Sequence, residues 1–164
     1  MADLQALDYA LRVCESIAFS LHSAIGLTEP CHGIGRGMTA DSLPVWFFQL
    51  AGLCLATVAA LNFLLGDTAY GDWVVLAAQM WVIAFHSGAV ATHSLVGHHP
   101  VAAGAPAVFV VMAFLITSVR VGSFFVALLA TAAFALLGVK LATVMVNPRT
   151  RVGLLAAGGE PACG

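Results

Sequence analysis

Three polar side chains, two of them imidazoles able to bind a metal or to transfer a proton, recur at seven-residue intervals in one apolar stretch, Trp73 to Gly97. They are Gln79, His86 and His93. On a helix of about 3.6 residues per turn, residues seven apart lie on one face. Interhelical hydrogen bonding is the favoured role of His86 and His93. Imidazole is also a common axial ligand of haem iron and could hold the magnesium of chlorophyll by the same chemistry, so both are candidate cofactor ligands.

A second polar series lies in the first apolar stretch, Leu4 to Thr28, and just beyond it. Its members also recur every seven residues: Asp8, Glu15, His22 and Glu29. His22 is a third candidate ligand, because a haem held by two histidines needs them on two helices. The series could also serve as a proton relay, or as an acid/base pair beside a quinone. The alternative, which we favour, is charge pairing, because Arg12 lies one turn from both Asp8 and Glu15.

The composition identifies the environment of these side chains. Of the 164 residues, 61% are hydrophobic and only 9% are charged, and the mean hydropathy is +0.99. These values are typical of an integral membrane protein. The net charge of −2 argues against nucleic-acid binding, so the expected partners are other integral membrane subunits and lipids.

Five apolar stretches predict an all-α, polytopic transmembrane bundle. Twenty residues at about 1.5 Å per residue cross a hydrocarbon core of roughly 30 Å. A glycine-rich loop from Pro30 to Met38, where proline stops the first helix, and a cap at Asp41 and Ser42 separate the first two spans. Residues 1–120 form the main bundle, 121–147 an additional helix and 148–164 a polar tail. The predicted spans are Leu4 to Thr28, Pro44 to Leu65, Trp73 to Gly97, Val101 to Val119, and Phe124 to Val146.

Two expectations about packing follow. An imidazole or carboxylate facing lipid without a partner is costly, so both polar series should point into the bundle. The small residues Ala84, Gly88 and Thr92, spaced four apart, predict a close approach by another helix, either of this chain or of a partner.

The sequence gives only weak indications of a metal site or of redox chemistry. The four cysteines contain no C-x-x-C pair, so neither a dithiol nor a zinc knuckle is indicated. A group of loop residues expected at one membrane face could bind zinc or copper, although ordinary interfacial loops are the favoured interpretation. Whether the protein holds any metal is left open. The group consists of Glu29, Cys31, His32, His98 and His99.

From Leu4 to Arg120 the chain resembles the DoxX-like family of small four-helix membrane proteins. The resemblance is carried by Arg12, by P-V-W-F-F-Q-L-A-G-L-C-L-A-T-V-A-A-L from Pro44, by L-A-A-Q-M from Leu76 with A-T-H-S-L further on, and by an apolar helix closing on Arg120. It implies a four-helix fold, to which this chain adds a fifth span. Family members have been tied to quinone-linked thiosulfate oxidation, to respiratory assemblies and to chaperoning of membrane proteins, and the family supplies no accepted catalytic residues.

The sequence therefore predicts one of two functions. The first is a non-catalytic accessory subunit of a respiratory or photosynthetic membrane complex. The alternative is a small membrane oxidoreductase, or a subunit that binds quinone, haem or chlorophyll through His22, His86 or His93. Either would reside in an organellar inner membrane, a thylakoid membrane or a bacterial inner membrane.

Overall fold

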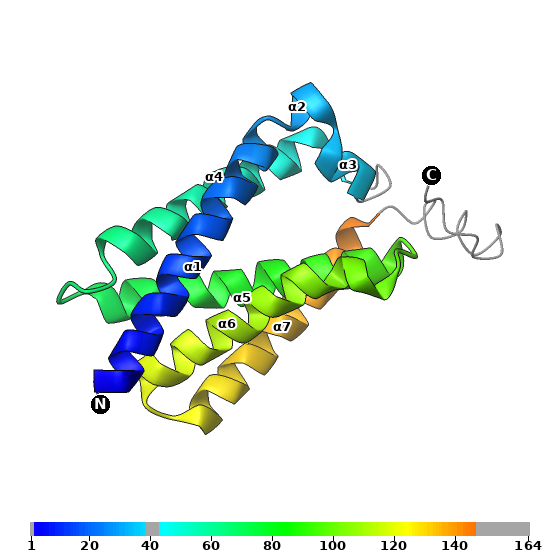
Figure 1. Cartoon of the computed structure of the whole chain (residues 1–164). Coiled ribbons are helices and arrows are strands. Elements are labelled where there is room, and N and C mark those ends of the chain that lie inside the picture. The colour runs from blue at the N-terminus through cyan, green and yellow to red at the C-terminus, as the bar shows by residue number, and fades with distance from the viewer. Residues whose placement is uncertain (1, 39–42, 147–164) are drawn as a thin grey trace.

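The computed structural model describes residues 2–38 and 43–146, and in these ranges the secondary structure is entirely helical (Figure 1). The predicted all-α bundle is confirmed. The long helices are α1 (Ala2–Leu27), α4 (Val45–Leu64), α5 (Gly71–Leu95), α6 (Gly104–Val121) and α7 (Phe124–Met145). The short ones are α2 (Glu29–His32), α3 (Ile34–Met38) and the 3-10 turn η1 (Pro100–Ala103).

Four helices, α4 to α7, are long and apolar enough to cross a membrane, with η1 extending α6. The chain is therefore a multi-pass membrane protein by length and composition. Helix α1 has 26 residues and thus the necessary length, but its sequence includes Asp3, Asp8, Arg12 and Glu15. A crossing by α1 depends on where those side chains point.

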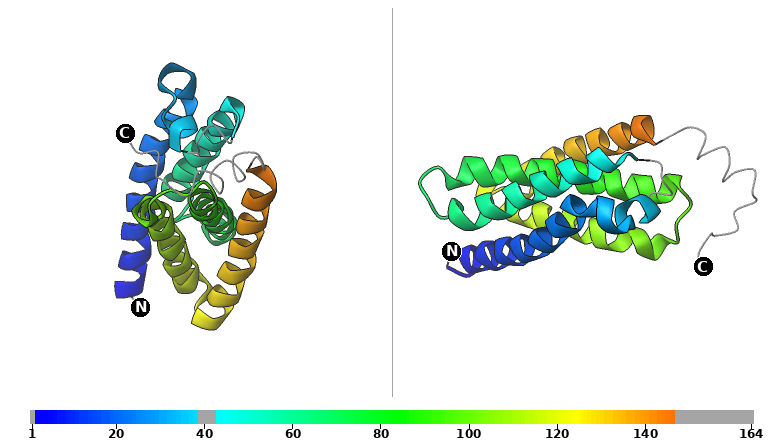
Figure 2. Two further views of the ribbon diagram at one scale, coloured as in Figure 1. Left: turned by 90° about the vertical axis from the view of Figure 1, so that its right-hand side faces the viewer. Right: turned by 90° about the horizontal axis from the view of Figure 1, so that it is seen from above.

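The long helices form two groups. Helix α1 packs mainly on α4, whereas α5 packs on α7 and α6, and α6 touches α1. In Figure 1 the two groups lie close at the end that carries the N-terminus and spread apart toward the end that carries α2 and α3. Figure 2 shows that the N-terminus and the end of α7 lie at opposite ends of the bundle.

Helix boundaries agree with the apolar stretches to within a few residues, but the glycine-rich loop was predicted wrongly. Its residues form α2 and α3, because Pro30 occupies the first turn of α2, where its missing N–H costs nothing. Gly33, at φ 67°, adopts the left-handed conformation that joins the two short helices. The predicted cap at Asp41 and Ser42 and the tail lie outside the described residues.

Close helix contacts occur where glycines face each other. A Cβ on Gly88 of α5 would lie 3.1 Å from the backbone oxygen of Gly138 on α7, and a Cβ on Gly138 would overlap the Ala84 oxygen. The predicted row of small residues is thus a packing surface, and its neighbour is this chain's own α7. On the other side, a Cβ on Gly26 of α1 would lie 2.6 Å from the Phe48 oxygen, so α1 and α4 approach just as closely.

Candidate functional site

The centre of the candidate site is a buried carboxyl group held by two amides. Glu15 of α1 is fully buried, and its Oε2 accepts hydrogen bonds from Asn62 Nδ2 of α4 at 3.0 Å and Gln79 Nε2 of α5 at 2.9 Å. Gln79 Nε2 also lies 3.3 Å from Asn62 Oδ1. Three helices are thereby joined through polar groups in an apolar interior.

A network of ion pairs lies next to this centre, toward the N-terminal end. Asp8 accepts from Arg12 Nε at 2.9 Å and from Arg120 of α6 at 2.8 and 3.0 Å. Arg12 Nη2 also pairs with Asp67 at 2.5 Å, and Arg120 Nη1 pairs with Asp72 at 2.8 Å. The two arginines are thus shared among three aspartates on α1, on α5 and in the α4–α5 turn.

The expected pairing of Arg12 with Glu15 does not occur in this arrangement. Arg12 uses Nη1 to donate to the backbone oxygen of Asn62 at 2.6 Å, near the end of α4, where carbonyls lack helical partners. Its guanidinium lies against Gly66, where a Cβ would collide with Nη1. Arg12 therefore ties α1 to the turn after α4, and Glu15 is left to the two amides.

Two hollows lie on this half of the bundle. A polar pocket of about 520 Å³ lies over the ion pairs, between the start of α1, the α4–α5 turn and the end of α6, and its lining includes Gln5, Thr68 and Val119. A groove of about 780 Å³ runs between α1 and α4 and is lined by small and apolar residues such as Ser16, Ser20 and Ala56. Glu15 and the candidate histidines line neither of them.

His86 lies further along α5 in an aromatic environment. It is buried, and its ring is surrounded by Phe19 at 5.4 Å, Phe85 at 5.1 Å and Phe109 at 4.9 Å between centroids. Its Nδ1 lies 3.0 Å from the Val82 oxygen, an atom that can only accept, so Nδ1 carries the proton and Nε2 the lone pair.

His22 does not follow the expected inward orientation. Glu15, Gln79, His86 and His93 are buried, but His22 is exposed, and its ring makes an edge contact with Phe109 of α6 at 5.9 Å. The contact with Phe109 places His22 on a face of α1 that lies near α6. The spacing of seven residues predicted its helical face correctly but not what covers that face.

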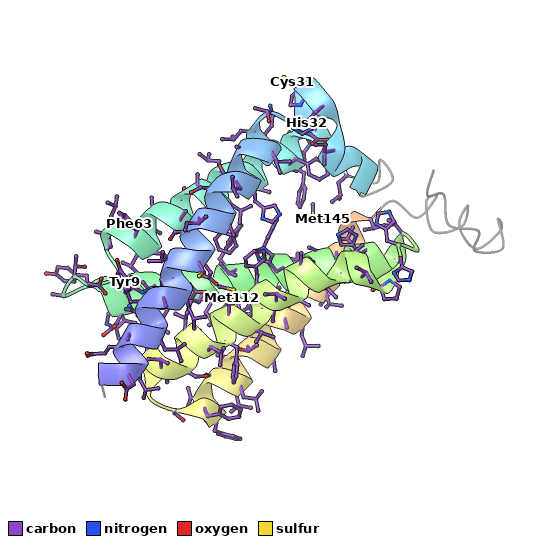
Figure 3. The ribbon with its side chains drawn as sticks, in the orientation of Figure 1. Tyr9, Cys31, His32, Phe63, Met112 and Met145 are labelled. Atoms are coloured by element: carbon purple, nitrogen blue, oxygen red, sulfur yellow. The ribbon has the colours of Figure 1, made fainter. Side chains whose placement is uncertain are left out.

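The opposite end of the bundle holds two separate polar groups. His93 and His98 face each other with their Nδ1 atoms 2.9 Å apart, and the His99 side chain caps η1. Near α2, the buried Glu29 accepts from the Gly35 N–H at 2.8 Å, while His32 contacts Thr28 and Ile25. Figure 3 shows Cys31 and His32 at this end and Tyr9 near the other.

These groups do not combine into a metal centre. Within residues 2–38 and 43–146, no three His, Cys, Asp or Glu side chains are close enough together to hold a metal ion. The suggested loop cluster is divided, with Glu29, Cys31 and His32 on α2 and His98 and His99 beyond α5.

Sequence reasoning missed Asn62 and Arg120 as members of the site. Asn62 is fully buried, and it is one of two amide side chains in the otherwise apolar α4, which was a usable signal. In the sequence, Arg120 indicated only where an apolar span ends. Its partner Asp8 lies 112 residues away in the chain, and no local spacing relates the two.

No protein-family model, curated protein or solved structure matches this chain. The resemblance to DoxX-like proteins stays a prediction that rests on the motif residues.

Proposed function

We propose that the protein is a non-catalytic accessory subunit of a membrane bioenergetic complex and acts by lateral association with other integral membrane subunits. The observation that supports this most directly is that its buried ionisable groups have hydrogen-bond or ion-pair partners within the bundle. Glu15 is held by two amides, Arg12 and Arg120 by aspartates, and His93 faces His98. Such contacts hold helices together, and the ionisable groups that line the polar pocket, Asp8, Asp67, Asp72 and Arg120, are paired with one another or with Arg12.

Helix α7 is the expected docking element. Only 11% of its span is buried against the rest of the chain, compared with 39% for α5. Its exposed face includes a stripe at alternating three- and four-residue spacing, in which large and small side chains are mixed, as in helix–helix contacts within membranes. The stripe consists of Phe125, Leu129, Ala132, Leu136, Val139 and Thr143.

The type of complex is a further part of the proposal. The DoxX-like resemblance favours a respiratory assembly, and candidate pigment ligands such as His86 favour a photosynthetic one. The corresponding membranes are an organellar or bacterial inner membrane and a thylakoid membrane.

The test replaces three residues on α7 and three on α4 in the full chain. We expect the α7 variant to leave the complex on a native gel of gently solubilised membranes and to migrate alone, because contact area is lost while the surface stays apolar. The α4 variant, matched in residue types and exposure, should remain bound. Co-migrating subunits are identified by mass spectrometry, and the band's absorption spectrum is recorded. The substitutions are Phe125→Ala, Leu129→Ala and Leu136→Ala on α7, and Leu50→Ala, Leu53→Ala and Phe63→Ala on α4.

Two results would count against this function. One is migration of the wild-type chain by itself from native membranes. The other is retention of both triple variants in the same complex.

A cofactor-binding function has one specific observation in its favour. His86 donates through Nδ1 to a backbone carbonyl, which is the arrangement that orients a metal-ligating imidazole and leaves Nε2 for the metal. Haem or chlorophyll bound there would supply electron transfer or light absorption. Under this alternative, His86→Leu removes a visible absorption band from the purified protein, whereas under the accessory-subunit proposal the spectra of wild type and variant agree.

A further inference from the structure

The carboxyl group of Glu15 has no cationic partner in the described structure. Arg12, one turn away, is used by Asp8, Asp67 and the Asn62 carbonyl, and Arg120 by Asp8, Asp72 and the Gly66 carbonyl. The three aspartates already outnumber the two arginines. An ionised carboxylate that is fully buried without a counter-ion is among the most unfavourable groups in a protein interior.

Two buried oxygens at this centre have no hydrogen-bond partner in the structure: Glu15 Oε1 and Gln79 Oε1. The second polar atoms of the two side chains are already hydrogen-bonded to each other, since Gln79 Nε2 donates to Glu15 Oε2 at 2.9 Å. Both remaining atoms are acceptors if Glu15 is ionised, so neither can satisfy the other. A carboxylic acid and a primary amide, by contrast, form a cyclic pair with two parallel hydrogen bonds.

We propose that Glu15 and Gln79 form a proton-binding site within the bundle, in which Glu15 carries a proton on Oε1 and donates it to Gln79 Oε1. One proton satisfies both unpaired oxygens and removes the uncompensated charge. The ligand is a hydrogen ion, and binding makes and breaks no other covalent bond. This site goes beyond the accessory function, because it makes the bundle responsive to protons.

The location of the pair gives the proton a structural consequence. Glu15 belongs to the α1–α4 group and Gln79 to the α5–α6–α7 group, between which α4 and α5 touch only sparsely. Release of the proton leaves a carboxylate facing the Gln79 oxygen across this junction. Proton binding therefore adds to the contacts that hold the two helix groups together, among them the Asp8–Arg120 ion pair.

The other titratable groups on the surrounding elements have partners other than Glu15. Asp8 and Arg12 on α1, Asp67 after α4, Asp72 on α5 and Arg120 on α6 are paired with one another. His86 lies two turns from Gln79 on α5 and is stacked on Phe19. None of them forms an ion pair with Glu15 in the described structure.

The test compares neutral isosteres of two buried carboxyl groups in the full chain. Glu15→Gln reproduces the cyclic pair without a titratable proton, so its midpoint of thermal unfolding in detergent at neutral pH should equal or exceed that of wild type. Asp8→Asn is the matched control: Asp8 accepts hydrogen bonds from two arginines, and its variant should lose about 5 °C or more because both ion pairs are broken. Because the folded chain holds a proton that the unfolded chain releases, wild-type stability should fall as pH rises, and this slope should be smaller in Glu15→Gln.

Infrared spectroscopy provides a second measurement that does not depend on stability. Wild type should show the carbonyl stretch of a protonated carboxylic acid, sensitive to deuteration, and this band should be absent from Glu15→Gln and displaced in Gln79→Leu. A drop in the midpoint of Glu15→Gln comparable to that of Asp8→Asn, with no acid band in wild type, would overturn the proposal. A midpoint that rises with sodium concentration in wild type but not in Glu15→Gln would also overturn it, since a bound cation requires the ionised carboxylate.

Discussion

Arg12 shows why one side chain can organise the end of a membrane bundle. Its Nε, Nη1 and Nη2 donate to three different acceptors, on α1, at the end of α4 and in the α4–α5 turn. A guanidinium presents its donors in a rigid planar fork, so the three contacts fix three segments relative to one another. Only 3% of the side chain is exposed, and these bonds are therefore poorly replaced by water.

Arg12→Lys keeps the charge but removes the fork, and we expect it to lower the free energy of unfolding by about 3 kcal/mol. A lysine ammonium placed near Asp8 leaves the Asn62 carbonyl and Asp67 without their donor. Unfolding by a denaturing detergent in mixed micelles measures the change. Lys140→Met on the exposed face of α7 is the control and should leave stability unchanged. Equal stability of Arg12→Lys and wild type would show that the fork geometry is unimportant.

For single residues, the sequence predicted the helix face of a polar side chain better than its hydrogen-bond partner. The seven-residue spacing placed Glu15, Gln79, His86 and His93 on inward faces because helical periodicity is a local property. Pairing Glu15 with Arg12 was wrong, because Arg12 had better acceptors at the end of a helix 50 residues away in the chain. Which polar group satisfies which depends on helix packing, and spacing along one helix does not report it.

Among the elements, α5 and α7 form a closely packed pair of helices. Gly88 and Gly138 bring the two backbones into contact, so dispersion forces and not the hydrophobic effect hold these helices together in lipid. The sequence predicted a close contact from the small residues of α5. It could not say that α7 was the neighbour, because a partner protein's helix would leave the same pattern on α5.

Gly138→Ala should separate α5 from α7 and lower the free energy of unfolding by about 2 kcal/mol, since its Cβ would overlap the Ala84 oxygen and neither backbone can yield locally. The matched control is Gly104→Ala at the start of α6, where a Cβ meets nothing within 4 Å. That variant should be as stable as wild type or slightly more stable, because alanine favours the helix. The same micelle titration serves both, and indistinguishable curves would contradict the tight crossing.

Across the whole molecule, the polar groups change character from one end to the other. Ion pairs occupy the N-terminal end, a carboxyl–amide centre follows, then an aromatic-lined histidine, and a histidine pair closes the far end. The ionisable side chains of Asp8, Arg12 and Glu15 on α1 are buried within this series, and the exposed Asp3 lies in the first turn of the helix. On this basis α1 is expected to cross the membrane alongside α4.

Single-cysteine chains test that crossing through the sidedness of three exposed positions. Cys31 is native and lies between α1 and α4, Thr68→Cys marks the α4–α5 turn, and Asp3→Cys marks the start of α1. All remaining cysteines are changed to serine in each chain, and intact vesicles are treated with a membrane-impermeant maleimide.

Because α4 crosses the membrane, Cys31 and Thr68→Cys must react from opposite sides, and this pair serves as the internal control. If α1 also crosses, Asp3→Cys is labelled from the same side as Thr68→Cys, because the N-terminus and the α4–α5 turn lie at the same end of the bundle in Figure 2. If α1 lies along the membrane surface, Asp3→Cys is labelled from the same side as Cys31, which is the side opposite to Thr68→Cys. The side on which Asp3→Cys is labelled therefore decides between five crossings, with the N-terminus and the end of α7 on opposite faces, and four.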